Sequence, residues 1–179
     1  MKTNWFATLL VAGSILCSAA TTFAAMPKAG DTAPLFEGTD QNGKEFKLAD
    51  LVGEKIVLLY FYPKDFTGGC TKEACSFRDG FEDFATNNVE IVGVSFDSAD
   101  SHLKFIAKYK LNFTLLADTD GKIADTYGVR TKNKQGDPMA KRVSFLIGLD
   151  GKIVHITDSR NPDIHLTEMK EAIAGLKKP

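Results

Sequence analysis

The sequence predicts a single α/β domain in which helices pack against a central mixed sheet. Continuous apolar runs, typical of strands buried on both faces, alternate with segments whose apolar residues recur at helical spacing. A strand hairpin and one last helix then close the chain. The 179 residues suffice for one compact domain, and 44% hydrophobic with 25% charged residues is a composition that supports a packed core.

The first 24 residues have the composition of a targeting segment and not of a folded domain. Lys2 supplies a positive start, residues 5–17 are apolar, and small residues follow up to Ala24 and Ala25. This three-part pattern is typical of a secretory signal peptide that is cleaved after one of these two alanines. We therefore expect an exported protein, in the periplasm of a bacterium.

Removal of the signal over 1–24 leaves one domain over 25–179, which contains two of the three cysteines. We expect that domain to have no stable association with a membrane. The alternative is an uncleaved anchor, since no charged residue lies between Lys2 and Lys28. In an exported protein, a close pair of cysteines indicates redox chemistry or a disulfide.

The first half of the domain begins with an irregular segment over 27–51, where Asn-Gly within the stretch 40–43 predicts a hairpin turn. The run Ile-Val-Leu-Leu-Tyr-Phe over 56–61 predicts a buried strand, and 63–69 is expected to be a loop. The next segment predicts one helix, because five apolar residues share a face at helical spacing: Cys70, Ala74, Phe77, Phe81 and Phe84.

The middle of the chain predicts a second buried strand over 89–96 and a helix over 98–109. A short strand over 113–117 and a short helix over 122–127 follow. The helix over 98–109 is expected to turn three residues toward the core: Leu103, Phe105 and Ile106.

The last part predicts a strand over 142–149, a tight turn at Asp150-Gly151 and an antiparallel strand over 152–157. An amphipathic helix over 164–176 closes the chain. Active-site loops in such domains lie beyond the carboxyl ends of strands, often at helix starts. Cys70 falls at such a place.

The charge pattern excludes several classes of function. The formal net charge is -1, so no basic excess indicates nucleic acid and no polybasic cluster indicates a membrane surface. None of the three histidines lies at metal-ligand spacing to another histidine or to a cysteine: His102, His155 and His165. We expect no bound metal and no nucleic-acid partner.

Cys70 is the first candidate for a reactive group. Thr67 is a good N-cap residue, which would place Gly68, Gly69 and Cys70 in the first turn of a helix. Free backbone N–H groups and the positive end of the helix dipole there favour a thiolate, which is the nucleophilic form of cysteine. The alternative is that Cys70 is a small buried hydrophobic residue on the apolar face of the helix.

Cys75 follows Cys70 by five positions, which on a regular helix separates the Cα atoms by about 8.7 Å, whereas a disulfide requires less than about 7 Å. A permanent disulfide would therefore break the helix that the apolar face demands. A transient disulfide formed by local unwinding fits better. Gly68 and Gly69 lower the cost of unwinding by roughly 1 kcal/mol each relative to alanine. The spacing is not that of a thioredoxin C-x-x-C pair.

At these residues the sequence resembles the peroxiredoxins. Pro63, Thr67 and Cys70 match the family's P-x-x-x-T-x-x-C motif. The surrounding stretches 60–65 and 71–75 look like the Q type, also called the bacterioferritin comigratory protein group. In that group a resolving cysteine commonly lies five residues after the peroxidatic one.

The later run Arg-Val-Ser-Phe-Leu-Ile over 142–147 is similar to the family's strand that carries an active-site arginine. The resemblance covers nearly all of the chain over 29–176. It implies a thioredoxin-like three-layer fold with a central mixed sheet and an N-terminal extension. It also implies a thiol-dependent peroxidase that reduces hydrogen peroxide and organic hydroperoxides without a cofactor. A thioredoxin-like protein would be the reductant, and the protein would be a monomer.

The resemblance gives five residues a role. Cys70 would be the peroxidatic cysteine and Cys75 the resolving cysteine, with an intramolecular disulfide between them. Arg142 would stabilise the thiolate and polarise the peroxide bond, Thr67 would offer its hydroxyl to the peroxide, and Pro63 would shield the sulfur. Without the resemblance, Arg142 reads as a solvated charge, Thr67 as an N-cap and Pro63 as a turn proline.

The sequence departs from the family pattern at Gly68, where a proline is usual. Proline at the first helical position is pre-organised and glycine is not, so we expect a looser first turn. Two other functions remain open at this point. One is a thiol–disulfide oxidoreductase of the cell envelope that acts on proteins, and the other is a redox-sensing or partner-binding domain without catalysis.

Overall fold

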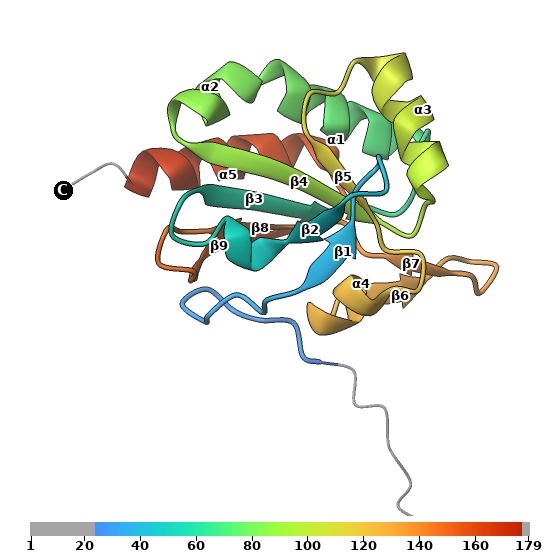
Figure 1. Ribbon diagram of the computed structural model, residues 1–179, viewed down its shortest axis with the longest axis horizontal. Helices are drawn as coiled ribbons and strands as arrows, with labels where there is room; N and C mark the ends of the chain where they lie inside the picture. Colours follow the sequence, from blue (N-terminus) through green and yellow to red (C-terminus); the bar gives the residue numbers. More distant parts are fainter. Residues whose placement is uncertain (1–23, 177–179) are drawn as a thin grey trace, which may run out of the picture.

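A five-stranded mixed sheet forms the centre of the computed structural model, which describes residues 24–176 (Figure 1). The strand order is β5-β4-β3-β8-β9. The pairs β3–β4 and β4–β5 are parallel, whereas β3–β8 and β8–β9 are antiparallel, which confirms the mixed sheet. The strands are β3 (Ile56–Phe61), β4 (Val89–Ser95), β5 (Thr114–Ala117), β8 (Val143–Ile147) and β9 (Ile153–Asp158).

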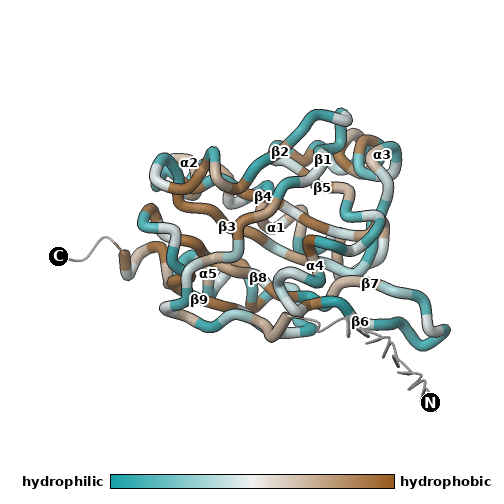
Figure 2. The backbone as a smooth tube through the Cα atoms, turned by 60° about the horizontal axis from the view of Figure 1, so that its bottom comes forward, coloured by the Kyte–Doolittle hydropathy of each residue, from teal (hydrophilic) through white to brown (hydrophobic). Residues whose placement is uncertain are grey.

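The central strand β3 buries both of its faces, as its apolar run predicts. Val57, Leu59 and Phe61 join one hydrophobic cluster. Leu58 and Tyr60 alternate with them and join a second cluster on the opposite face. Figure 2 shows β3 and its neighbours as the brown interior of the domain.

Four helices cover one face of the sheet, and the N-terminal segment with one short helix covers the other (Figure 1). The first group comprises α1 (Gly68–Asp79), α2 (Phe81–Thr86), α3 (Ala99–Tyr109) and α5 (Pro162–Leu176). The second comprises β1 (Glu37–Thr39), β2 (Glu45–Lys47), η1 (Leu48–Asp50) and α4 (Lys122–Thr126). The hairpin turn over 40–43 is confirmed by the antiparallel pairing of β1 with β2.

The prediction of a single helix that carries the apolar residues from Cys70 to Phe84 is wrong. Gly80 divides this segment into α1 and α2. A Cβ at Gly80 would lie 3.2 Å from Leu166 Cδ1 of α5, so the missing side chain lets α5 approach the break. Phe77 and Phe84 are nevertheless both buried on the same side. The apolar pattern therefore spans two helices.

The prediction that Leu103 of α3 faces the core is also wrong, because its exposed fraction is 44%. His102 is fully buried in its place, since its ring contacts Asp65 and the carbonyl of Leu116. Phe105 is buried as expected, and Ile106 is half-buried.

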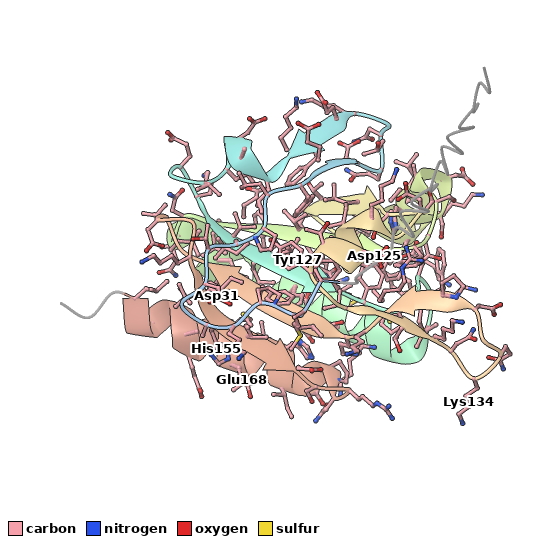
Figure 3. All side chains as sticks on the ribbon, turned by 90° about the horizontal axis from the view of Figure 1, so that it is seen from below. Asp31, Asp125, Tyr127, Lys134, His155 and Glu168 are labelled. Atoms are coloured by element: carbon pink, nitrogen blue, oxygen red, sulfur yellow. The ribbon has the colours of Figure 1, made fainter. Side chains whose placement is uncertain are left out.

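The structure adds one hairpin that the sequence did not indicate to us. It consists of β6 (Arg130–Lys132) and β7 (Pro138–Ala140), which pair antiparallel. Asn133 shapes the turn, because its side-chain oxygen accepts hydrogen bonds from the backbone N–H groups of Gln135 and Asp137. The hairpin projects from the body of the domain, with Lys134 at its tip (Figure 3).

The expected signal peptide over 1–24 lies outside the described residues except for Ala24. Among the helices within residues 24–176, none combines the length and the apolar character that crossing a bilayer requires.

Candidate active site

The loop after β3 delivers Cys70 to the start of α1, as expected. Thr67 is the N-cap residue in an extended conformation, and Cys70 is the third residue of the helix. The sulfur-bearing side chain is almost fully buried, at 1% exposure. Cys70 therefore sits where backbone N–H groups at a helix start are unpaired within the helix.

Arg142 reaches Cys70 because of how the sheet is paired. It directly precedes β8, whose first residue Val143 pairs with Phe61 at the end of β3. Its Nη2 lies 3.3 Å from the sulfur of Cys70 and donates a hydrogen bond to it. Two residues separated by 72 positions are thus brought together.

Glu73 is the other partner of Arg142, and our sequence reasoning missed it. Arg142 Nη1 donates to Glu73 Oε2, and the Glu73 side chain is completely buried. Burial raises the pKa of Glu73 to about 7, against the opposing effect of the Arg142 charge. The only signal in the sequence was a glutamate three residues after Cys70, on the side of α1 that faces the core.

Arg142 is a half-buried cation held between two acidic groups. Burial alone would lower its pKa, but Glu73 and Cys70 together raise that pKa above its ordinary value. The guanidinium suits this position because it presents several donors in a fixed plane.

Thr67 and Pro63 line the approach to the site. The Thr67 hydroxyl donates to the carbonyl of Lys64 and makes no hydrogen bond that caps α1, so its capping is limited to its backbone conformation. Pro63 is shared by two clefts that also share Met139. One, of about 440 Å³, is lined by Arg142, and the other, of about 390 Å³, is lined by Thr67.

A further cavity of about 580 Å³ lies between Asp125, Arg130 and Pro138, and neither Cys70 nor Arg142 lines it. The cleft that Arg142 lines is the more cationic one, because three further cations line it with a single carboxylate: Lys132, Lys141, Arg160 and Asp158. The β6–β7 hairpin contributes to the walls of both clefts at Pro63.

Two glycines open the first turn of α1, and they differ in their surroundings. A Cβ at Gly69 would lie 3.1 Å from Arg142 Nη2, whereas a Cβ at Gly68 would meet nothing within 4 Å. Gly69 therefore leaves room for the guanidinium, and Gly68 has no comparable neighbour.

Cys75 lies farther along the same helix. Both cysteines are free, with Cys70 buried and Cys75 half-buried. Because α1 extends from Gly68 to Asp79, the whole segment between the two thiols is helical.

A buried polar cluster anchors the loop that precedes α1. The Asp65 carboxylate accepts hydrogen bonds from Tyr62 OH at 2.8 Å and Ser101 Oγ at 2.7 Å, and it lies 2.9 Å from His102 Nδ1. The Asp65 N–H donates to Asp97. The loop from Pro63 to Thr67 is thereby tied to α3.

Within residues 24–176, no group of three or more histidine, cysteine or acidic side chains is arranged to hold a metal ion. The thiol of Cys70, the guanidinium of Arg142 and the carboxyl of Glu73 are the groups that this site offers for chemistry.

Comparison with known sequences assigns the protein to a family. Residues 29–156 match the AhpC/TSA family. The chain belongs to this family. It is similar to peroxiredoxin Bcp of Escherichia coli (strain K12), with 41% identity over 151 residues that cover 80% of this chain and 96% of that protein. It is also similar to the chloroplastic peroxiredoxin Q of Sedum lineare, with 37% identity over 83% of this chain and 78% of that protein.

Solved structures of peroxiredoxins share the fold of this AhpC/TSA member. Peroxidoxin BcpB of Mycobacterium tuberculosis superposes with a TM-score of 0.79 at 35% identity, over 86% of this chain and 100% of that chain. A cysteine-to-serine mutant of PrxQ from Xylella fastidiosa gives 0.72 at 27% identity, over 83% and 98%. The expected thioredoxin-like fold with a central mixed sheet is confirmed, and the chain is a thiol-dependent peroxidase of the peroxiredoxin Q/Bcp group.

Proposed function

We propose that Cys70 is the peroxidatic cysteine and that Arg142 activates it. The observation that carries this proposal is the hydrogen bond from Arg142 Nη2 to the Cys70 sulfur. The positive charge stabilises the thiolate, and its second donor is fixed by Glu73. The cleft beside Arg142 gives a peroxide access to this corner of the sheet.

The first step consumes the peroxide. The Cys70 thiolate attacks the terminal oxygen of ROOH, an S–O bond forms, and the O–O bond breaks. Cysteine is oxidised to sulfenic acid, and the leaving alkoxide or hydroxide takes up a proton to become ROH or water. Arg142 stabilises the negative charge that develops, because its Nη2 donor is already directed at the reacting sulfur. Thr67 and Pro63 are proposed to orient and enclose the peroxide.

Cys75 is proposed as the resolving cysteine. Its thiolate attacks the sulfenic sulfur, the Cys70–Cys75 disulfide forms, and hydroxide leaves as water. Because both residues lie in α1, this step requires the first turns of the helix to unwind. An external dithiol, proposed to belong to a thioredoxin-like protein, then reduces the disulfide.

The substrates are proposed to include organic hydroperoxides as well as hydrogen peroxide. The bacterioferritin comigratory protein of Xanthomonas campestris, 29% identical with a TM-score of 0.73 over 80% of this chain and 92% of that one, is described as having alkyl peroxide reduction activity. A cleft of about 440 Å³ supports the extension, since it exceeds the volume of hydrogen peroxide.

Peroxide consumption with dithiothreitol tests the roles of the two thiols. Cys70→Ser is expected to abolish turnover, and equal turnover by this variant would refute the assignment. Intact-mass analysis after one equivalent of peroxide is expected to show the loss of two hydrogens in the wild type. A stable gain of one oxygen in the wild type would make Cys75 a bystander.

Export to the periplasm and a monomeric state are further parts of the proposal. Export is supported by the signal-like pattern over 1–24. N-terminal sequencing of protein from a cell-envelope fraction should begin at Ala25 or Met26, and a chain that begins at Met1 would contradict cleavage. Light scattering should give the mass of one chain.

A further inference from the structure

His165 of α5 lies against the buried carboxyl of Glu73, whose other oxygen accepts from Arg142. Its side chain is fully buried, and its Nδ1 is 3.4 Å from Glu73 Oε1. No hydrogen bond joins these two atoms, and Oε1 has no other partner among the described residues. A buried carboxyl oxygen therefore faces an imidazole nitrogen directly.

The hydrogen bonds of His165 fix the position of one ring proton. Nε2 lies 2.8 Å from the carbonyl of Ser159, which can only accept, so Nε2 carries a hydrogen. Nδ1 lies 2.7 Å from Ser144 Oγ. In the neutral ring, Nδ1 is then an acceptor that takes the hydrogen of the Ser144 hydroxyl, and Glu73 Oε1 lies 3.4 Å from the same nitrogen.

Two unprotonated acceptors facing each other in the interior are unfavourable. A single proton between Glu73 Oε1 and His165 Nδ1 removes the conflict, whichever atom carries it. Burial raises the pKa of Glu73 and lowers the pKa of His165, so both effects place this proton on Glu73.

The proton changes how the charge of Arg142 is shared. With the proton present, the Glu73–His165 pair is neutral, and the guanidinium is balanced by the Cys70 thiolate alone. With the proton lost, the Glu73 carboxylate balances the positive charge of Arg142. The Cys70 thiolate is then an additional buried anion with no cation of its own.

We propose that His165 is a positioning residue for Cys70, which together with Glu73 retains a proton and so leaves the charge of Arg142 available to the thiolate. This inference rests on the reactive role of Cys70 proposed above. Ser144 supports it by fixing the orientation of the imidazole.

The other ionisable groups around the pair do not provide the proton. Tyr60 faces it from β3 and stays neutral, because burial, then Glu73 and Cys70, raise its pKa well above the ordinary value. Glu168 of α5 and Asp158 of β9 act to raise the pKa of His165. Burial lowers that pKa by more, so the pKa of His165 stays below its ordinary value. Glu168 is itself engaged by Thr157 and His155.

The rate of carbamidomethylation of Cys70 by iodoacetamide measures the thiolate directly, without peroxide turnover. It is followed in the full chain by peptide mass spectrometry between pH 4 and pH 9. In the wild type we expect a profile broader than one titration, because two coupled protons contribute.

His165→Asn keeps an amide donor near Glu73 but cannot bind a second proton, so it favours the carboxylate. The pH midpoint of Cys70 alkylation is expected to rise by about one unit, which makes alkylation about tenfold slower below the midpoint. Glu73→Gln removes the competing charge and is expected to lower the midpoint. Ser144→Ala is expected to shift it upward by less than His165→Asn.

His155→Asn is the matched control, since this partly exposed histidine pairs with Glu168 (Figure 3). The charged partners of Glu73 are Arg142 and His165 instead. His155→Asn should leave the profile unchanged. Shifts of the same sign in His165→Asn and Glu73→Gln, or an unchanged midpoint in a folded His165→Asn variant, would overturn the proposal. Because alkylation needs no turnover, loss of the peroxidase assignment would be recognised separately.

Discussion

Arg142 donates a hydrogen bond to the sulfur of Cys70 across 3.3 Å, from the residue directly before β8 to the first turn of α1. The contact depends on the antiparallel pairing of β8 with β3, which brings the two ends together. Since its other terminal nitrogen is occupied by Glu73, the guanidinium has a single orientation at the sulfur.

Arg142→Lys should therefore impair the reaction despite keeping the charge. A lysine cannot donate in two fixed directions to Glu73 and to Cys70 at once. We expect kcat/KM for hydrogen peroxide to fall by about 10²-fold, the cost of losing one directed donor at a reacting centre. Peroxide consumption with dithiothreitol measures this. An exposed lysine that lines neither cleft supplies the control, as Lys44→Ala should stay within about twofold of wild type.

Gly68→Pro should stiffen the start of α1. Thr67 is extended, with φ -78° and ψ 148°, which is the conformation that a following proline requires, and a Cβ at Gly68 meets no atom within 4 Å. We expect a gain of about 0.4–1 kcal/mol in stability and slower hydrogen exchange in this turn. Disulfide formation after peroxide addition should slow down as well. Exchange that is slower in the wild type would contradict the prediction.

Gly69→Ala is the matched comparison one residue later. Its Cβ would lie 3.1 Å from Arg142 Nη2, so the guanidinium that donates to the sulfur must move by a few tenths of an ångström. We expect kcat/KM to fall by about tenfold, because the donor at the reacting sulfur is displaced. The midpoint of urea unfolding should change little. An active Gly69→Ala variant would show that the guanidinium tolerates displacement.

Glu73→Gln should change how stability depends on pH. The folded protein holds the Glu73 proton up to a pKa of about 7, whereas the unfolded chain releases it near the ordinary value of 4.5. The native state thus binds more protons between these values, and the free energy of unfolding of the wild type falls as pH rises through this window. Relative to Glu73→Gln, the fall should be about 3 kcal/mol, at about 1.4 kcal/mol per pH unit. Urea unfolding at several pH values measures it, and parallel curves for the two proteins would refute it.

Asp65→Asn should loosen the loop before Cys70. Tyr62 donates to one carboxylate oxygen of Asp65, and Ser101 donates to the other, which also lies 2.9 Å from His102 Nδ1. Asparagine keeps one acceptor oxygen and places an NH2 donor at the other position, so the contacts at one of the two oxygens are lost. We expect a loss of about 1–3 kcal/mol, typical of leaving a buried polar group without its hydrogen-bond partner. The exposed pair of Asp100 with Lys104 provides a control, since Asp100→Asn should cost less than about 0.5 kcal/mol.

The sequence was sufficient to predict the sheet and the position of Cys70. The run over 56–61 is continuous in apolar residues and coincides with β3. A strand that is buried on both faces needs apolar residues at successive positions, and this pattern predicted it. The motif from Pro63 to Cys70 located the loop and the helix start, and Arg142 was recognised through the same resemblance.

Other features depend on tertiary contacts that no local pattern encodes. Glu73 is buried where Arg142, directly before β8, reaches it. His102 takes the place of Leu103 in the core, where its ring nitrogens lie within hydrogen-bond distance of Asp65 and of the Leu116 carbonyl. The β6–β7 hairpin was missed because its strands have three residues each and little apolar character. The turn residues Asn133 and Gly136 were the one available signal.

In the proposed cycle through a Cys70–Cys75 disulfide, the break at Gly80 limits how far the protein must open. Unwinding that begins at Gly68 and reaches Cys75 uses most of the 12 residues of α1, but it need not pass into α2. Phe84 can then remain in the core while the preceding helix opens. We expect α1 to open as a separate cooperative unit in native-state hydrogen exchange, so that the proposed reaction can repeat without exposing the whole interior to aggregation.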